Sequence, residues 1–344
     1  MMEVNALIAK VAKTIMNSET TDVSMNIYDW DWVCGVGIYG VARAWVKTGE
    51  ACYHDFVSAW TSKMISHAYD NKTVNSTCPL LAVLELCSKE QHKEYLKVCR
   101  DIADWLMDGA TKSVDGAYEH TCVQNGGIVF RDQAWADTLF MACIFLARMG
   151  ALTDCEAYTK AAAEQLVLHH RLLKDKKTGL FYHGWDGAAR NHMSGALWGR
   201  ANAWIVASTV EILECLPAEF EDRDIVLKSL ENQMNALEVY QRENGMFGTV
   251  LDRTEAYDET SAPAGISYGI FRGIRSGVIS SAHRTMAEKA ARAVIERISE
   301  DGVVAEVSIG TPVMPTIEEY YEYIWKAPTL YGQALALLML CEMI

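Results

Sequence analysis

The connections between the helices that this sequence predicts are alternately short and long. Apolar residues recur every three to four positions along most of the chain, which contains only six prolines, and this spacing predicts helices throughout. We expect about twelve helices, near residues 3–18, 30–48, 51–68, 76–89, 91–109, 131–150, 154–174, 195–215, 218–240, 258–276, 281–300 and 328–343. Each even-numbered helix follows a long connection, whereas each later odd-numbered helix follows a short one that makes it an antiparallel neighbour of the helix before it. We therefore expect the long loops to lie at one end of the molecule.

The even-numbered helices also differ from the odd-numbered ones in composition. Odd-numbered helices are charged on one face, as in PAEFEDRDIVLKSLENQMNALEVYQ, whereas even-numbered ones such as AWADTLFMACIFLARMG are apolar nearly all round, which indicates burial on both sides. Hairpins of one outer and one inner helix predict an all-α fold, an (α/α)6 barrel formed by a single domain over residues 1–344. An open helical solenoid has repeats of similar length, but it rarely carries long loops rich in Trp and Gly on one side.

Charge and cysteine usage exclude several classes of function. The chain has 31 Lys and Arg against 45 Asp and Glu, a net charge of −14, which argues against a surface for nucleic acid or for an anionic membrane. No apolar run approaches the roughly 20 residues that span a bilayer, and the start lacks the pattern of a secretory signal. The ten cysteines form no CxxC pair, so no zinc site is indicated. We expect a soluble cytoplasmic protein, and the sequence does not indicate its oligomeric state.

Polar and aromatic residues gather where the N-terminal ends of the predicted inner helices meet. Aromatic faces stack on the C–H faces of sugars, while polar side chains bind hydroxyl groups, so this set predicts a carbohydrate site. Any one Trp is equally consistent with core packing, and the clustering favours a site. The segment DGAYEHTCVQNGGIVF predicts a short β-ribbon with an Asn125-Gly126 turn beside the site. The residues expected to bind substrate are Trp32, Asn75, Trp135, His183, Trp185, Asp186, Trp198, Arg200, Glu259 and Tyr331.

Asp137 is the strongest candidate for a catalytic residue. It lies in the apolar segment AWADTLFMACIF, where an ionised carboxylate is costly unless it is paired or faces a cavity. Burial would raise its pKa and keep it partly protonated near neutral pH, as a general acid requires. The alternative is a helix cap, for which Asp132 is the better candidate.

Arg200 and His183 have both functional and structural interpretations. Arg200 lies in LWGRANAW, a stretch with no other charge, and it would either bind a substrate carboxylate or form an ion pair with Asp186 or Glu259. His183 would orient a hydroxyl group, assist a proton transfer or simply pack. Asp252, Glu255 and Glu259 are too scattered to predict a metal site.

Seven segments in order carry a resemblance to a known family. They are WDWVCGVGIYG, TVNSTCPLLAVLEL, WADTLFMA, HGWD, WGRANAW, YDETSAPAG and YGQALALL. The sequence resembles the unsaturated glucuronyl and rhamnogalacturonyl hydrolases of glycoside hydrolase family 105, with family 88 a more distant relative. The resemblance implies an (α/α)6 barrel. It also implies removal of a 4,5-unsaturated uronic acid from the non-reducing end of the pectin or glycosaminoglycan fragments that polysaccharide lyases leave.

The resemblance also implies a mechanism with one acid, unlike ordinary glycoside hydrolysis by two carboxyl groups. The Asp that matches the family's acid, Asp137, would protonate C4 of the C4=C5 double bond, water would add at C5, and the hemiketal would open and release the sugar. His183 and Arg200 would hold the ring and its carboxylate, with no metal or organic cofactor. The chain departs from the family pattern at Ala201 and Ala203, which replace glycines, and at Asn75, which replaces a carboxylate.

Two other interpretations of the residues stay open at this point. A sugar 2-epimerase on the same barrel would use a pair of histidines as bases. A non-catalytic carbohydrate-binding or scaffold protein would keep the aromatic residues but would not need Asp137. The fold alone does not separate these functions from a hydrolase.

Overall fold

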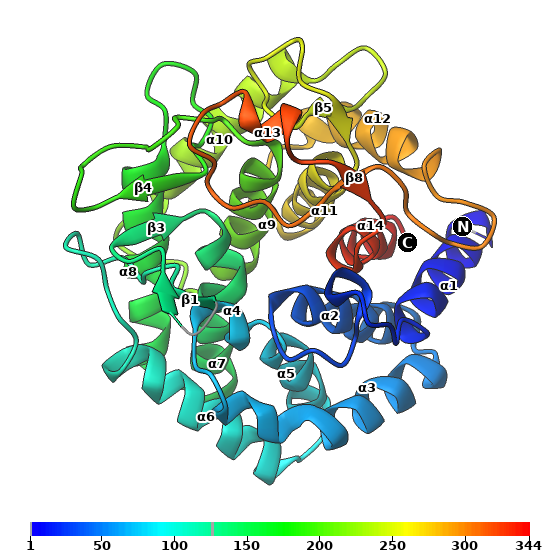
Figure 1. Ribbon diagram of the computed structural model, residues 1–344. Coiled ribbons are helices and arrows are strands. Elements are labelled where there is room, and N and C mark those ends of the chain that lie inside the picture. Colours follow the sequence, from blue (N-terminus) through cyan, green and yellow to red (C-terminus); the bar gives the residue numbers. More distant parts are fainter. Residues whose placement is uncertain (1, 125–126) are drawn as a thin grey trace.

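The protein is a closed double ring of helices, as seen in the computed structural model, which describes residues 2–124 and 127–344. Figure 1 looks along the axis of the ring, with the chain passing round it from blue to red. The inner helices are α2 (Trp32–Thr48), α5 (Leu80–Lys89), α7 (Ile144–Thr153), α9 (Gly199–Cys215), α11 (Ser261–Ser276) and α14 (Leu330–Glu342). The outer helices are α1 (Met2–Met16), α3 (Ala51–Met64), α6 (Lys93–Asp108), α8 (Glu156–Leu173), α10 (Arg223–Tyr240) and α12 (Arg284–Ile295).

The inner ring closes on itself. Each inner helix packs against the next, and the last, α14, packs against the first, α2. An open solenoid would leave these two helices apart, so the predicted (α/α)6 barrel is confirmed. Burial follows the predicted alternation, because every residue of α14 from Leu330 to Cys341 is buried, whereas outer helix α6 buries only one stripe of residues.

Small residues let the inner helices approach closely. A Cβ atom at Gly35 of α2 would lie 2.8 Å from the Cβ of Cys78, and one at Gly265 of α11 would lie 2.8 Å from the Cβ of Ala203 in α9. Both distances are shorter than carbon atoms tolerate. Gly35 and Gly265 are therefore required by the close packing at these two points.

A buried ionic network joins five inner helices away from the loop-bearing end. Arg148 of α7 donates to Glu85 of α5 at 2.6 Å and to Glu211 of α9 at 2.9 Å. Arg43 of α2 also binds Glu85, at 2.9 Å, and Arg272 of α11 lies 3.3 Å from Glu211. Burial raises the pKa of Glu85, but the charges of Arg148 and Arg43 outweigh it and hold the pKa at about 2.

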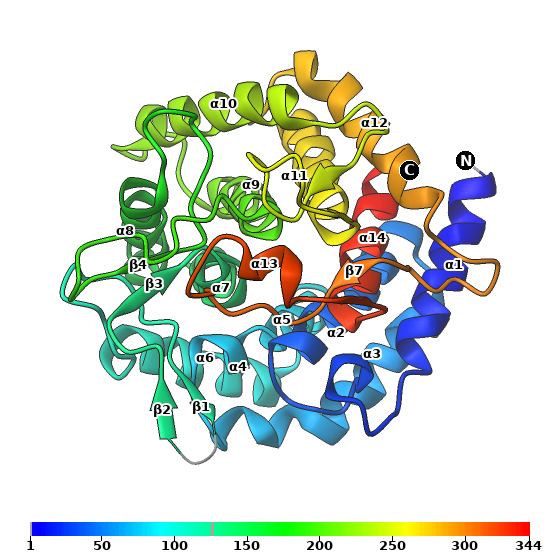
Figure 2. The same ribbon diagram turned by 45° about the horizontal axis from the view of Figure 1, so that its top comes forward.

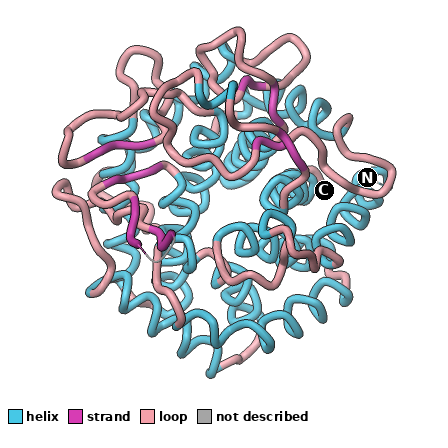
Figure 3. The backbone as a smooth tube through the Cα atoms, viewed as in Figure 1, coloured by secondary structure: helices cyan, strands magenta, loops and turns pink. Residues whose placement is uncertain are grey.

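The long loops carry four small antiparallel ribbons at one end of the barrel (Figure 3). The paired strands are β1 (Cys122–Gln124) with β2 (Gly127–Val129), β3 (Gln133–Trp135) with β4 (Gly184–Asp186), β5 (Phe247–Gly248) with β6 (Asp258–Glu259), and β7 (Val307–Ser308) with β8 (Lys326–Ala327). The predicted ribbon near residue 120 is confirmed, while its Asn125-Gly126 turn lies outside the described residues.

Three local features differ from the predicted helices. The helix expected over 131–150 starts later, because residues 133–135 pair with β4, and its first turn is the π-helix η3 (Leu139–Cys143). The helix expected over 76–89 is divided into α4 (Val74–Thr77) and α5 around Pro79, which cannot donate a backbone hydrogen bond. The loop before α14 contains an unexpected short helix, α13 (Glu319–Glu322). The remaining short elements are the 3₁₀ helices η1 (Val23–Met25), η2 (Ile65–Tyr69) and η4 (Ser281–His283).

In the described ranges, no helix combines the length and the apolar character that crossing a membrane requires. The same ranges contain no group of three or more His, Cys, Asp or Glu side chains arranged to hold a metal ion.

Candidate active site

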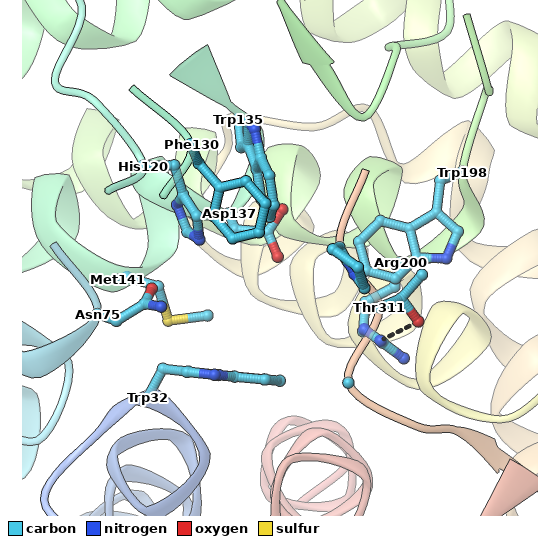
Figure 4. Close-up of a pocket in the computed structure, with 12 residues that line it drawn as sticks. Trp32, Asn75, His120, Phe130, Trp135, Asp137, Met141, Trp198, Arg200 and Thr311 are labelled. Atoms are coloured by element: carbon cyan, nitrogen blue, oxygen red, sulfur yellow. Dashed lines mark hydrogen bonds between the residues drawn. The ribbon is translucent and has the colours of Figure 1, made fainter. Parts of the chain in front are cut away.

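A cavity of about 240 Å³ opens at the ribbon-bearing end of the barrel. Figure 4 shows its lining side chains, which come from the starts of inner helices and from the loops between them. Six of the residues predicted from the sequence line this cavity, namely Trp32, Asn75, Trp135, Asp137, Trp198 and Arg200. The wall also contains His120, Phe130, Met141, Gly310, Thr311 and Pro312, which the sequence did not single out.

Asp137 lies between strand β3 and the π-helix η3, at the start of an inner helix. π-turns are rare and occur mostly at functional sites, and this one begins directly after Asp137 and Thr138. The side chain is 8% exposed, and its Oδ2 makes a single long contact, 3.4 Å to Nε2 of His183. Figure 4 shows the carboxylate pointing into the cavity. Because this contact is long, the carboxylate keeps the capacity to bind a ligand group in the cavity.

The pKa of Asp137 is lowered in the free protein, and the expected upward shift is wrong. Burial raises the pKa of this carboxyl, but the contact with His183 and the charges of His183, His120 and Arg200 outweigh burial. The Oδ2 atom lies 3.4 Å from Nε2 of His183. Asp137 is therefore ionised at neutral pH before substrate binds.

His183 links Asp137 to Tyr320 of α13. The Nδ1 atom of His183 lies 2.7 Å from the Tyr320 hydroxyl, whose oxygen accepts a hydrogen bond from the backbone N–H of Met314 at 3.3 Å. The hydroxyl proton is therefore available to Nδ1, which places the ring proton on Nε2, facing Asp137. Burial lowers the pKa of His183 despite the opposing effect of Asp137, so the ring is neutral at neutral pH. Figure 2 shows the α13 segment in front of the inner ring.

Arg200 is a buried cation without a carboxylate partner. It is 1% exposed and lies between the rings of Trp198 and Tyr331, with its Cζ 4.4 Å and 4.8 Å from their centroids. Its terminal nitrogens donate to oxygens of the 308–311 segment, including the Ser308 carbonyl at 2.8 Å, while Nε has no partner. Within the described part of the chain no carboxylate forms an ion pair with Arg200, so the structural alternative of a pair with Asp186 or Glu259 is wrong.

Trp32 offers its ring face to the cavity. The ring stacks on Tyr331 at a centroid distance of 4.7 Å, and its other face lines the cavity opposite Asp137 (Figure 4). Trp135 is already covered, because His120 stacks on it at 4.4 Å and Phe130 packs against it at 4.6 Å. Trp32 is therefore the tryptophan best placed to stack on a sugar ring.

Asn75 supplies an amide on the wall between Trp32 and Met141 (Figure 4). It is 6% exposed and its Oδ1 has no hydrogen-bond partner among the described residues. The short helix α4 holds it in place through a capping box in which the Thr73 and Ser76 side chains bind each other's backbone N–H groups.

The structure does not place the other predicted residues on the cavity wall. His183 and Tyr331 lie behind it, in contact with Asp137 and Trp32 respectively. Trp185 points to the opposite face of the β3–β4 ribbon, and Asp186 accepts from the Ala189 N–H in its own loop at 2.8 Å. Glu259 is fully buried and caps α11, accepting from the backbone N–H groups of residues 261 and 262.

Comparison with known proteins agrees with this fold. The family model for Glycosyl Hydrolase Family 88 matches residues 7–344. The unsaturated rhamnogalacturonyl hydrolase YesR of Bacillus subtilis (strain 168) is 33% identical over 317 residues, which cover 92% of this chain and 90% of that protein.

Solved structures show the same architecture. Two crystal structures, each titled a possible member of the GH105 family, come from Salmonella enterica and Klebsiella pneumoniae. Both have a TM-score of 0.93, with 30% and 29% identity, and the match covers 99% of this chain and 93% of each of theirs. The unsaturated glucuronyl hydrolase of Bacillus sp. GL1 shares the fold, with a TM-score of 0.76 at 16% identity over 99% of this chain and 96% of that one.

Proposed function

Because the chain belongs to Glycosyl Hydrolase Family 88, we propose that it removes a 4,5-unsaturated uronic acid from the non-reducing end of oligosaccharides left by polysaccharide lyases. The unsaturated rhamnogalacturonan disaccharide, a product of pectin degradation, is the substrate that the YesR relative suggests. The observation that carries the proposal is the buried, unpaired Arg200 cation on the same small cavity as Asp137. The family match favours a hydrolase over the sugar 2-epimerase and over the non-catalytic protein.

The uronate carboxylate is recognised by the charge of Arg200. A buried cation that no carboxylate contacts directly favours an anionic ligand, and this one lies in a protein of net charge −14 that otherwise repels anions. The carboxylate reaches the guanidinium by replacing the 3.2 Å contact of Nη2 to Thr311, which also lines the cavity. The sugar ring stacks on Trp32, and the Asn75 amide binds a hydroxyl group.

Asp137 delivers a proton to C4 of the substrate. The new C4–H bond forms with the electron pair of the C4=C5 double bond, which leaves a cation at C5 that the ring oxygen stabilises. Water then forms a bond to C5 and returns a proton to the Asp137 carboxylate. The hemiketal opens to a C5 ketone, and the exposed C1 hemiacetal releases the attached sugar.

The substrate itself supplies the protonation state that this step needs. Asp137 is ionised in the free protein, where its pKa is lowered. A uronate carboxylate bound at Arg200 places a second negative charge near Asp137 and partly neutralises the positive charge of Arg200. Both effects raise the pKa of Asp137. Substrate binding thereby converts the carboxylate into a general acid.

The whole ring forms one catalytic domain in this proposal, because helices from both ends of the chain close the barrel. We place the reaction in the cytoplasm, where thiols stay reduced. The support is that nine of the ten cysteines are free thiols.

The test is turnover of the unsaturated rhamnogalacturonan disaccharide, followed by ultraviolet absorbance and by release of the second sugar. Both should change together, because hydration removes the C4=C5 chromophore. A saturated disaccharide of the same composition should not react. Interconversion of an intact saturated sugar with no activity on the unsaturated one would replace this proposal with the epimerase.

A further inference from the structure

A second cavity lies on the outer side of the β3–β4 ribbon, against α8. Figure 1 shows this ribbon beside α8. Its volume is about 620 Å³. Trp135 pairs with Gly184 in the ribbon, and Ala134 pairs with Trp185. Successive side chains of a strand point to opposite faces, so Trp135 faces the active site while Trp185 faces this outer cavity. The same ribbon therefore forms a wall of both cavities.

Three rings form an ordered aromatic wall in the outer cavity. Tyr182 stacks on His192 at a centroid distance of 4.0 Å, and Trp185 meets His192 edge-on at 5.0 Å. The Trp185 indole donates to Asp115 at 2.8 Å, and His192 Nε2 donates to the Leu172 carbonyl at 2.8 Å. The rings are thus fixed in position and remain partly exposed, which is the arrangement that stacks on sugar rings.

Cations surround this aromatic wall. Four line the outer cavity, namely Arg171, Lys174, Lys176 and Arg190. The first three also line an adjoining cavity of about 610 Å³, to which Lys228 contributes a further charge. We call the two cavities together the basic groove.

Most of these cations have no carboxylate partner. Arg190 lies 3.8 Å from Asp115, but no ion pair involves Arg171, Lys176 or Lys228 within the described ranges. The neighbouring Asp175 is occupied by its own loop, where it accepts from backbone N–H groups at 177 and 178. Asp224 also lines the groove, which gives three carboxylates against five cations. The groove therefore carries an excess of positive charge on a chain of net charge −14.

We propose that the basic groove binds a short acidic oligosaccharide at a site separate from the active site. The choice of ligand rests on the proposed function, while the site itself rests on the rings and the unpaired cations. Rigid aromatic faces bind the sugar rings, and the cations bind uronate carboxylates. The surrounding negative charge disfavours a long polyanion such as nucleic acid, so the ligand is short. A fragment held here lies across one ribbon from the catalytic cavity.

The experiment follows the indole N–H signals in an ¹⁵N–¹H NMR spectrum during titration with the saturated trimer of galacturonic acid, which lacks the reacting double bond. The Trp185 signal is identified as the one missing from Trp185→Phe. It should shift saturably in the parent. The triple variant Arg171→Gln, Lys176→Gln, Lys228→Gln should raise the dissociation constant read at this signal by about tenfold.

A matched variant distinguishes the effect of the groove cations from the effect of the protein's net charge. Lys10→Gln, Lys13→Gln and Lys89→Gln together remove the same charge from exposed positions on α1 and α5, and should leave the dissociation constant unchanged. No shift of the Trp185 signal at millimolar trimer, an equal shift with a neutral trisaccharide, or equal weakening in both triple variants would overturn the proposal.

Turnover of the unsaturated disaccharide is measured on the same samples. The groove triple should keep the parent's turnover, because its three residues do not line the catalytic cavity. Loss of disaccharide turnover in the triple variant alone would show that the groove residues belong to the catalytic machinery and contradict a separate site. If the parent itself does not turn over the disaccharide, the proposed function fails, whereas the groove is judged by the Trp185 signal alone.

Discussion

Asp137 and Arg200 are both buried beside the same cavity, but their surroundings impose opposite requirements on a ligand. Asp137 already has His183 within 3.4 Å, and its pKa is lowered. Arg200 has hydrogen bonds to neutral oxygens but no carboxylate partner in the described ranges. An anionic substrate satisfies the second residue and at the same time raises the pKa of the first. Binding and activation are therefore coupled through one carboxylate.

The first prediction at this scale concerns the charge of Arg200. Replacing it in Arg200→Met removes a charge-assisted contact worth roughly 1.5–3 kcal/mol, so KM for the unsaturated disaccharide should rise roughly ten- to a hundredfold. Arg200→Lys should recover only part of the lost affinity, because an ammonium group cannot make the two parallel hydrogen bonds that a guanidinium makes to a carboxylate. Steady-state kinetics measure the effect, and melting temperature checks that the 308–311 segment stays folded. An unchanged KM in a folded Arg200→Met variant would remove Arg200 from the site.

The second prediction concerns pH. If the substrate carboxylate raises the pKa of Asp137, the alkaline limb of kcat, where Asp137 loses its proton, should lie at higher pH for the free uronide than for its methyl ester. The ester carries no charge, so Asp137 stays ionised at neutral pH and activity should recover as the pH falls. Coincident profiles for the two substrates would show that the carboxylate does not activate Asp137.

The third prediction tests Tyr320 as a positioning residue. Tyr320→Phe removes the hydroxyl that holds the Nε2–H tautomer of His183, so the pKa of Asp137 should rise and the alkaline limb of kcat should move to higher pH. KM should change little. Tyr257→Phe is the matched control, because that hydroxyl donates to the backbone carbonyls of Ile324 at 2.7 Å and Tyr320 at 3.4 Å, supporting the same segment without contacting His183. A purely structural role for the Tyr320 hydroxyl would lower the melting temperature of Tyr320→Phe without moving its pH profile.

The sequence identified the cavity residues that stand out against apolar inner helices. Asp137 and Arg200 were identified because a charged side chain in a buried apolar helix is costly unless it is paired or faces a cavity. His120 and Thr311 were missed because they lie on long loops, where polar residues are ordinary and the path of the loop decides their position. The direction of the Asp137 pKa was wrong because His183, which lies on another loop, opposes the effect of burial.

At the scale of helices, the buried ionic network replaces apolar packing where five inner helices meet. Its members pair across the ring, as when Arg148 contacts both Glu85 and Glu211. Sequence patterns predicted that these helices are buried, but they could not predict which charged residues, far apart in the chain, form ion pairs. The π-helix η3 was missed for a related reason, since its apolar residues have no pattern that distinguishes a π-turn from an α-turn.

A prediction about stability follows from this network. Glu85→Gln leaves two buried arginines without a full partner and should lower the free energy of unfolding by about 3–5 kcal/mol at pH 7. The pKa of Glu85 in the folded protein is about 2, below its ordinary value of 4.5. Its contribution is therefore complete above the unfolded pKa and is lost as the pH falls from about 4.5 through about 2, so parent and variant should converge over this range.

Urea unfolding at several pH values measures this effect. The control is Lys97→Gln, which removes an exposed pair with Asp101 and should cost less than about 1 kcal/mol. An unfolding free energy for Glu85→Gln equal to that of the parent at pH 7 would show that the network does not stabilise the ring.

At the scale of the whole molecule, the alternation of short and long connections determined the architecture. Short connections make helical hairpins, and hairpins with one apolar helix each bury those helices by closing a ring, which α14 completes against α2. The same alternation places the loops at one end, where the cavity lies. The path of the long segment before α14 was not predictable, because its contacts are with distant parts of the ring, and this segment supplies Tyr320 and Thr311.

The central claim is that the barrel cleaves its substrate by hydrating the C4=C5 double bond, with Asp137 as the proton donor. The direct measurement is mass spectrometry of the earliest product formed in D₂O, sampled before the keto product exchanges, together with ultraviolet absorbance. We predict one deuterium at C4, loss of the chromophore with sugar release, and a kcat reduced by roughly 10²–10⁴-fold in Asp137→Asn. An early product that lacks deuterium and still absorbs, or an Asp137→Asn variant as fast as the parent, would contradict the account.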